Sequence, residues 1–333
     1  MQRVLIPVAL SAPPPSPVAH GALCQWAGDT MGTTWSVSAV LAAGQRAQDI
    51  DAGIRAVLAH VIAQMSNWSE TSDITRFNRA EAGSWIALPD DCFAVVQAAL
   101  QVARDSGGAY DPSAGPLVDL WGFGPAGRRA TAPSPDDVAR VRQHCGWQRL
   151  EIDPVQRRAR QPGGLSLDLC AIAKGFAVDA VSRFLEAQGV AHHLVEIGGE
   201  LRGQGLKPDG MPWWVELEAP APDGAATRTL IALLGLSVAT SGDYRRYVEH
   251  DGQRYAHTID PRTGYPAAHA LASVTVIHRD CMMADALSTA LTVLGPQAGI
   301  AFARRHALAA RFLVRTPHGF EELTTPAWAA MLS

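Results

Sequence analysis

A carboxylate and a hydroxyl four positions apart in a largely apolar segment are the first residues in this chain that could do chemistry. Asp285 and Thr289 are four positions apart in a run of Met, Ala and Leu that extends from Asp280 to Gly295. In an α-helix this spacing places both oxygens on one face, one turn apart, where they could reach the same hard cation. Two oxygens do not complete a site, so other ligands must come from elsewhere. The structural alternative is that Asp285 pairs with an arginine and Thr289 bonds back to a carbonyl of its own helix.

Lys174 is a second candidate, because it lies where a strand is expected to lead into a helix. The segment Leu165–Asp179 predicts this strand-to-helix transition, and Lys174 falls near the helix N-terminus. A cation is unfavourable there unless an anion lies beside it, so the position suggests a phosphate held by the lysine and by free backbone N–H groups. The alternative is a surface lysine whose amine reaches water.

Trp68 is a third candidate, because it directly precedes the polar, turn-like segment Ser69–Asn78. An exposed tryptophan beside such a loop could stack on a flat ligand, whereas a core tryptophan is the alternative. A longer loop follows at residues 109–125, where Gly and Pro are too frequent for regular structure. Such a loop is either a binding loop or a packed Ω-loop.

Periodic apolar residues predict the elements that would position these groups. Helices are expected at about residues 50–65, 91–105, 174–189 and 280–295, the last with Asp280 as N-cap and Gly295-Pro296 as its stop. A strand is expected at Met31–Val40, and short strand-like runs follow at residues 193–200, 213–217, 230–234 and 237–240. Ser241-Gly242-Asp243-Tyr244 predicts only a tight turn. The pattern indicates an α+β fold with mixed sheets and packed helices.

Composition excludes several classes of protein. With 333 residues, 47% of them hydrophobic, the chain can bury a substantial core. Its 28 basic and 32 acidic residues give a net charge of −4 without a basic block, which argues against a nucleic-acid-binding surface. No apolar run approaches the ~20 residues that span a bilayer. The five cysteines are widely separated and include no CxxC pair, so a zinc ribbon or disulfide framework is not expected.

The first 25 residues suggest an export signal. Arg3 precedes the apolar run Val4–Leu10, a Pro-rich spacer follows, and Ala19–Ala22 offers a small-residue cleavage site. Residues 1–25 are therefore expected to form a leader segment, and the alternative is a disordered leader of a cytoplasmic protein. Cys24 could suggest a lipoprotein acceptor, but Leu23 stands where a small residue is expected.

Short motifs recur in a fixed order through residues 31–295. They are Met31-Gly32-Thr33, Met65–Trp68 with Ser72–Asn78, Tyr110-Asp111-Pro112 with Gly115–Val118, Asp168–Gly175, Val195–Gly199, Ala239–Tyr244, His257–Gly264, and Ala284-Asp285-Ala286 with Thr289-Ala290-Leu291. As an ordered set they give the chain a resemblance to the FAD:protein FMN transferase (ApbE) family. The resemblance implies transfer of the FMN half of FAD to a Thr or Ser hydroxyl of a target protein, with release of AMP and a requirement for Mg²⁺.

The resemblance also implies roles for individual residues. Asp285, Thr289 and the backbone carbonyl of Ala171 match the family's magnesium ligands. The residues that match its FAD contacts are Met31, Trp68, Ala109, Tyr110, Asp111, Asp168, Lys174 and Ile259. In that chemistry a metal and a lysine would neutralise phosphoryl charge while a base positions the attacking hydroxyl. His257 is the candidate base because the ordinary pKa of histidine, near 6.5, suits proton transfer at neutral pH, and Asp243 is the alternative.

Three functions from different classes remain open: the transferase, an FAD diphosphatase that uses water as nucleophile, and a flavin-binding carrier without chemistry. The metal pair together with His257 argues against the carrier. For the transferase we expect one domain at residues 26–333, with lobes at about 26–190 and 191–333 and the flavin in a cleft between them. Family members are typically exported, so we expect a periplasmic or membrane-attached protein whose acceptor is a flavoprotein such as a respiratory redox-complex subunit.

Overall fold

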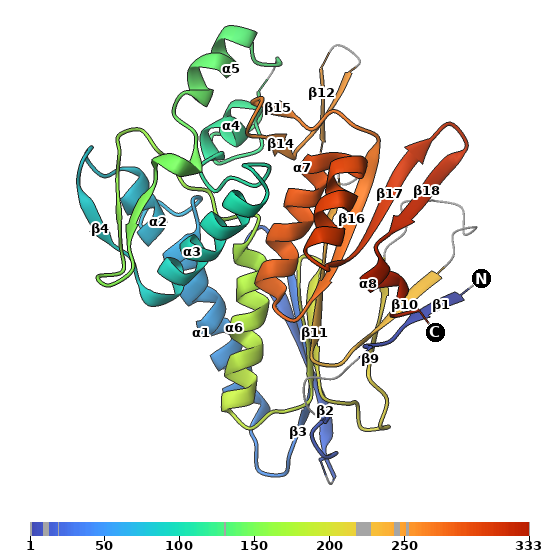
Figure 1. The fold of residues 1–333 in the computed structure, drawn as a ribbon. Helices are drawn as coiled ribbons and strands as arrows, with labels where there is room; N and C mark the ends of the chain where they lie inside the picture. Colours follow the sequence, from blue (N-terminus) through green and yellow to red (C-terminus); the bar gives the residue numbers. More distant parts are fainter. Residues whose placement is uncertain are drawn as a thin grey trace.

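An eight-stranded antiparallel sheet forms the centre of the computed structural model (Figure 1). The structure describes residues 2–8, 13–18, 20–129, 131–217, 228–242, 247–250 and 253–332. The strand order is β18-β17-β16-β11-β8-β7-β3-β2, formed by Gly319–Thr324, Ala309–Thr316, Leu271–His278, Leu236–Gly242, Glu200–Gln204, His193–Ile197, Thr33–Leu41 and Ala22–Thr30. Strands from both halves of the chain thus share one sheet. Together with the helices this confirms the expected α+β class.

Long helices cover one face of this sheet (Figure 1). They are α1 (Ala47–Met65), α3 (Asp90–Asp105), α6 (Ala173–Ala187) and α7 (Cys281–Arg305). Helix α6 lies between α1 and α7, and α7 packs on β11 and β16. The buried apolar faces of these helices form a single core with the sheet, which extends from Trp35 to Phe312. Residues before and after position 190 thus contribute to the same core.

Gly175 is the point of closest approach between α6 and α7. A Cβ atom built at this position would lie only 2.3 Å from the carbonyl oxygen of Cys281, which no side chain could tolerate. The missing side chain lets the N-terminus of α6 lie directly against the first turn of α7. Lys174 and Asp285, on these two helices, are brought together in this way.

Smaller elements surround this centre. Three-stranded sheets are formed by β1 (Gln2–Leu5), β10 (Arg228–Leu233) and β9 (Trp213–Leu217), and by β4 (Trp85–Ala87), β6 (Arg158–Arg160) and β5 (Glu151–Asp153). Two-stranded pairs are β12 (Tyr247–His250) with β13 (Gln253–Ala256), and β14 (Ile259–Asp260) with β15 (Tyr265–Pro266). Short helices are α2 (Asp73–Asn78), α4 (Gly115–Leu120), α5 (Pro135–Arg142), η1 (Trp147–Arg149) and α8 (Pro326–Ala329).

Several local predictions were wrong. The segment expected to be turn-like contains helix α2, because the Ser72 side chain accepts a hydrogen bond from the Thr75 N–H and caps it. The Gly- and Pro-rich loop contains helix α4, in which Pro116 occupies the first turn, where a missing N–H costs little. The expected turn at Ser241-Gly242 is instead the end of strand β11. Helix α7 has non-helical dihedrals at Gly295 (φ 76°), the predicted stop, but a further helical segment continues to Arg305.

The N-terminal residues take part in the fold that the structure describes. Strand β1 pairs with β10 in parallel, and Leu5 is completely buried in a second apolar cluster. Leu5 also bridges to Leu332, so the two ends of the chain lie together (Figure 1). Strand β2 begins at Ala22, directly after the expected cleavage region.

Helix α7 is, within the described ranges, the one helix that is long and apolar enough to cross a membrane. Most of its apolar window (61%) is buried inside the fold. Packing against the central sheet and α6 accounts for this apolar character, as in the core helix of a globular domain.

Candidate functional site

The centre of the site is a buried ion pair between helices α6 and α7. The Lys174 ammonium lies 2.9 Å from Glu200 Oε1 and 3.5 Å from Asp285 Oδ1. Asp285 and Glu200 are buried, with 3% and 5% of their surfaces exposed. Asp285 therefore pairs with a lysine, and the arginine partner of the structural alternative was wrong.

These charges set one another's protonation. Burial acts to lower the pKa of Lys174, but the carboxylates of Asp285 and Glu200 outweigh it and hold that pKa above its ordinary value. Burial raises the pKa of Glu200 to about 7, against the opposing effect of Lys174. The lysine is therefore a permanent cation whose anionic neighbours are protein carboxylates.

The N-terminus of α6 binds Asp285 directly. The backbone N–H of Gly175 donates to Asp285 Oδ2 at 3.0 Å. Gly175 is the third residue of α6, so its N–H is one of the groups at a helix start that have no acceptor within the helix. Among the described residues, no hydrogen bond to the Ala171 carbonyl is recorded. This helix end binds a protein carboxylate in the structure, whereas the phosphate expected there and the role of the Ala171 carbonyl as a metal ligand stay predictions.

Hydroxyl groups occupy the next turn of α7. Thr289 Oγ1 lies 3.1 Å from Ser241 Oγ, which also lies 2.7 Å from Ser288 Oγ. Ser288 donates to the carbonyl of Asp285, and Thr292 donates to that of Ser288. Ser288 and Thr292 thus make the hydroxyl-to-carbonyl hydrogen bonds within α7 that were considered for Thr289. The Thr289 hydroxyl instead contacts Ser241 on strand β11.

The donor set fits a hard divalent cation. Asp285 supplies a carboxylate, Thr289 a hydroxyl and Ala171 a carbonyl, and all three are oxygen ligands of the kind that Mg²⁺ prefers. A positive group, the Lys174 ammonium, already lies against Asp285 Oδ1. No group of three or more His, Cys, Asp or Glu side chains suited to a metal exists within the described ranges. Any metal here would therefore depend on hydroxyl and carbonyl oxygens.

Tyr110 and Asp168 face the same charges. Burial, followed by the charges of Asp285 and Asp168, raises the pKa of Tyr110 well above its ordinary value. The Tyr110 hydroxyl is buried and finds no hydrogen-bond partner among the described residues. An O–H left unpaired in a buried position costs about 1–3 kcal/mol, so it is a natural donor to a bound ligand. Asp168 itself accepts the N–H of Cys170 at 2.8 Å, which shapes the turn before α6.

Trp68 lies beside that turn. Its ring is 61% exposed, which rules out the core alternative. The adjacent Asn67 accepts a hydrogen bond from the Cys170 thiol at 3.4 Å, so the segment before α2 borders the Asp168 turn. Met31 has left-handed backbone dihedrals (φ 49°) in the β2–β3 turn. A Cβ built at Gly198 would lie 2.9 Å from Thr33 and 3.4 Å from Glu200 Oε2, which places this turn near the ion pair.

A second group of predicted residues gathers around α4. Ile259 packs against Leu117 and Trp121 in a small apolar cluster. The Trp121 indole donates to the carbonyl of Gly264 at 2.9 Å and thereby ties α4 to the β14–β15 turn. His257 is half-buried, and its ring meets the edge of Phe123 with 6.2 Å between ring centres. Residues 109–125 therefore connect the Asp168 turn with the segment that carries His257.

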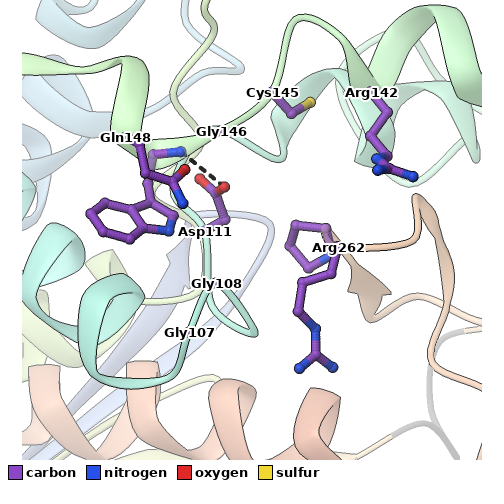
Figure 2. Close-up of a pocket in the computed structure, with 10 residues that line it drawn as sticks. Gly107, Gly108, Asp111, Arg142, Cys145, Gly146, Gln148 and Arg262 are labelled. Atoms are coloured by element: carbon purple, nitrogen blue, oxygen red, sulfur yellow. Dashed lines mark hydrogen bonds between the residues drawn. The ribbon is translucent and has the colours of Figure 1, made fainter.

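Asp111 has a structural function in this arrangement. Its carboxylate accepts the backbone N–H groups of Ser113 and Trp147, at 2.8 and 3.0 Å, and the Ser113 hydroxyl at 2.7 Å. Burial raises the pKa of Asp111, and these hydrogen bonds oppose that shift. Figure 2 shows Asp111 turned toward the Gly146 segment, with Arg262 on another side of the hollow that they line. Arg262 is itself paired with Asp260 at 2.8 Å.

Two predicted residues, Ala109 and Asp243, and one residue that was not predicted, Glu200, complete the set. Ala109 is buried, so only its backbone could meet a ligand. Asp243 lies outside the described residues. Glu200 is the site residue that sequence patterns missed, since it was placed only at the end of a strand-like run. A carboxylate directly after Gly198-Gly199, at the first position of strand β8, is the signal that could have singled it out.

Known proteins resemble this chain over most of its length. The model of the ApbE family matches residues 31–312. A curated FAD:protein FMN transferase of Vibrio cholerae is 37% identical over 307 residues, which is 92% of each chain. The enzyme of that name from Haemophilus influenzae is 38% identical over 303 residues, covering 88% of this chain and 87% of its own.

Solved structures agree with the sequence comparison. The apo form of the flavinyl transferase ApbE of Pseudomonas stutzeri has a TM-score of 0.87 and 43% identity, and covers 93% of this chain and 97% of that one. Flavin transferase ApbE from Vibrio cholerae also has a TM-score of 0.87, with 35% identity and 93% and 99% coverage. The likeness extends over nearly the whole of each chain.

Proposed function

The chain belongs to the ApbE family, and we propose that it transfers the FMN moiety of FAD to a Thr or Ser hydroxyl of an acceptor protein and releases AMP. It is an enzyme, a flavin transferase like its relatives. The observation that carries the proposal is the Lys174–Asp285 pair at the start of α6, with the Ser241–Thr289 hydroxyl contact one turn further along α7. The pair sets a cation against an oxygen ligand, and a metal bound there would add the positive charge that the transfer of a phosphoryl group requires.

The transfer exchanges one phosphorus–oxygen bond for another. The acceptor hydroxyl oxygen bonds to the phosphorus of the FMN half, and the bond from that phosphorus to the bridging oxygen breaks, so AMP leaves with the bridging oxygen. The proton of the attacking hydroxyl passes to His257, whose ring is held by Phe123. Lys174 offsets negative charge on the phosphoryl oxygens. Mg²⁺ bound by Asp285, Thr289 and Ala171 would supply further positive charge at the pyrophosphate.

The flavin half requires a flat, partly apolar surface. Trp68 is exposed and borders the Asp168 turn, so it is suited to stack on the isoalloxazine or adenine ring. The unpaired hydroxyl of Tyr110 supports a hydrogen bond to FAD in the same region. Met31, Ala109, Asp111 and Ile259 are further proposed contacts, Ala109 through its backbone.

An FAD diphosphatase is the second candidate, because water could replace the acceptor hydroxyl at the same phosphorus. The charge arrangement around Lys174 would serve either nucleophile, and it argues against a carrier without chemistry. The two enzymes differ in their products: the transferase gives a labelled acceptor and AMP, whereas the diphosphatase gives free FMN and AMP. Incubation with FAD, Mg²⁺ and an acceptor, followed by measurement of AMP and of the acceptor's mass, separates them.

We propose that the enzyme works outside the cytoplasm, in the periplasm or attached to the outer side of the inner membrane. The support is the Arg3, Val4–Leu10 and Ala19–Ala22 pattern of an export signal. Its acceptor would then be an exported flavoprotein, for example a subunit of a respiratory redox complex.

A further inference from the structure

Lys174 is held unequally by its two carboxylates. Its ammonium makes a short ion pair with Glu200 Oε1, at 2.9 Å, and a longer one with Asp285 Oδ1, at 3.5 Å. The second oxygen of Asp285 is already bound by the Gly175 N–H. Asp285 Oδ1 is thus the weakly held atom of the cluster, and it is also the atom that a cation would bind.

Glu200 has little function apart from Lys174. It is 5% exposed, and Lys174 is the only side-chain donor to its carboxylate that the described residues provide. Its other oxygen, Oε2, is buried without a hydrogen-bond partner in the same part of the chain and lies against Gly198 and Thr33. A buried carboxylate with a hydrogen-bond partner on only one of its two oxygens destabilises the fold. Its retention here indicates that its negative charge serves Lys174.

The charges of the cluster leave room for a cation. One ammonium faces two carboxylates, so a negative charge is left over when both are ionised. A cation at Asp285 Oδ1 would repel the Lys174 ammonium. Because a buried charge without a counter-charge is costly, the ammonium must then keep another carboxylate as its ion-pair partner. Glu200 is that partner, since the shorter ion pair does not involve Asp285.

We infer that Glu200 is a positioning residue that holds Lys174 beside the site while a divalent cation takes its place on Asp285. The inference rests on the proposed function, because it assumes a cation at Asp285. Lys174 and the cation are alternative partners of Asp285 Oδ1, and Glu200 keeps the displaced ammonium available to a phosphoryl group.

The test measures Mn²⁺ binding by electron paramagnetic resonance, without FAD or acceptor, for the intact chain and three variants. These are Glu200→Gln, Lys174→Met and the double variant, and Mn²⁺ serves as a probe because it accepts the same oxygen ligands as Mg²⁺. We expect Glu200→Gln to weaken Mn²⁺ binding about tenfold, because Lys174 then remains on Asp285. We expect Lys174→Met alone to bind Mn²⁺ more tightly than the intact chain. When Lys174 is already methionine, adding Glu200→Gln should change the Mn²⁺ affinity by less than about threefold.

Other results overturn the inference in recognisable ways. Equal weakening by Glu200→Gln in both backgrounds would mean that Glu200 acts on the cation directly. An unchanged affinity in Glu200→Gln would mean that Glu200 only fills space. An active wild-type enzyme with either result disproves this inference alone, whereas a wild type that binds no Mn²⁺ disproves it together with the metal requirement of the proposed function.

Two further variants keep the test interpretable. Glu186→Gln removes a carboxylate from the exposed C-terminal end of α6, and we expect it to leave Mn²⁺ affinity unchanged. If Glu200→Gln fails to fold, Glu200→Asp replaces it, since the shorter side chain keeps the charge but withdraws it from Lys174. We expect Glu200→Asp to weaken Mn²⁺ binding, and normal binding by a folded Glu200→Asp in the absence of a folded Gln variant would overturn the inference.

Discussion

The backbone N–H of Gly175 donates to Asp285 Oδ2 across 3.0 Å, joining the start of one helix to the second turn of another. The carboxylate of Asp285 therefore lies at the N-terminus of α6, where the helix dipole favours negative charge. This N–H has no acceptor within α6, because Gly175 is the third residue of that helix. One contact thus holds the carboxylate of Asp285, a proposed metal ligand, at the start of α6.

Asp285→Asn should abolish metal-dependent turnover while the fold survives. Asparagine can still accept the Gly175 N–H, and Lys174 keeps its shorter ion pair with Glu200. We expect AMP release to fall by roughly 10²-fold or more, as when a group that stabilises transition-state charge is lost. We expect the free energy of unfolding to fall by about 1 kcal/mol, since one charge-assisted contact is weakened.

AMP release at a series of Mg²⁺ concentrations and thermal unfolding measure the two effects. Thr289→Val is the matched comparison on the same helix face, and it should weaken metal activation less, because it removes a neutral ligand. An unfolded Asp285→Asn variant, together with a wild type whose activity survives chelation, would show that the pair is only structural.

His257→Asn should lower turnover and leave FAD affinity nearly unchanged. A positioned general base typically contributes about 10²- to 10⁴-fold, and asparagine cannot take up the proton of the acceptor hydroxyl. FAD titration, thermal unfolding and AMP release on this one variant distinguish the possible roles. Weaker FAD binding in step with the rate would indicate a phosphate contact, and a lowered melting temperature with proportionate loss of activity would indicate a packing role.

Full AMP release and acceptor labelling by a well-folded His257→Asn variant would exclude the histidine as base. Asp243 would then be tested in the same way. Its position outside the described residues leaves the comparison between the two to experiment.

Trp68→Ala should weaken FAD binding without a change in stability. Its ring is 61% exposed, so truncation should change the free energy of unfolding by no more than about 0.5 kcal/mol. Stacking of an aromatic side chain on a base contributes about 1–3 kcal/mol, which corresponds to a rise in Kd of about 5- to 150-fold. Quenching of flavin fluorescence measures the Kd, and Trp68→Phe should retain most of the affinity.

Trp85→Ala is the control for that experiment. Trp85 is also exposed, and its ring stacks under Arg158 in the small β4–β6–β5 sheet. We expect its FAD affinity to equal that of the wild type. Equal losses in both tryptophan variants, or none in Trp68→Ala, would argue against stacking at Trp68.

Cleavage of an export signal would remove a strand that contributes to the core. We expect the protein from its native host to begin after about Gly21 and to be found outside the cytoplasm. Without β1 the buried Leu5 is lost, so a chain that begins at Ala22 should unfold at a lower temperature than the full-length chain. N-terminal sequencing of fractionated cells decides the matter: a chain with residues 1–21 intact in the cytosol contradicts export.

The sequence predicted the helices well because their apolar periodicity is strong. The spacing of Asp285 and Thr289 on one helix was enough to propose a shared ligand, and the structure keeps Asp285 buried within that helix. The short helices α2 and α4 were missed, because a Ser72 cap and a Pro116 start outweigh polar, Gly-rich composition over six residues. Strand β1 escaped prediction because its pairing depends on β10, more than 200 residues later.

The partners of Lys174 could not have been predicted from local patterns. A phosphate was expected beside this lysine, and in the structure two protein carboxylates lie against it. Glu200 and Asp285 are 26 and 111 positions away from Lys174, so only the tertiary fold brings them together. Sequence spacing reports neighbours within an element, whereas this site is formed by the approach of two helices and a strand.

The most direct test of the account follows both products of one reaction. The enzyme is incubated with FAD, Mg²⁺ and a purified acceptor flavoprotein stripped of flavin, and AMP and the intact mass of the acceptor are measured over time. The account predicts an acceptor whose mass rises by one FMN moiety at a Thr or Ser, an equal amount of AMP, and neither product with Asp285→Asn. AMP accompanied by free FMN and an acceptor of unchanged mass would contradict it.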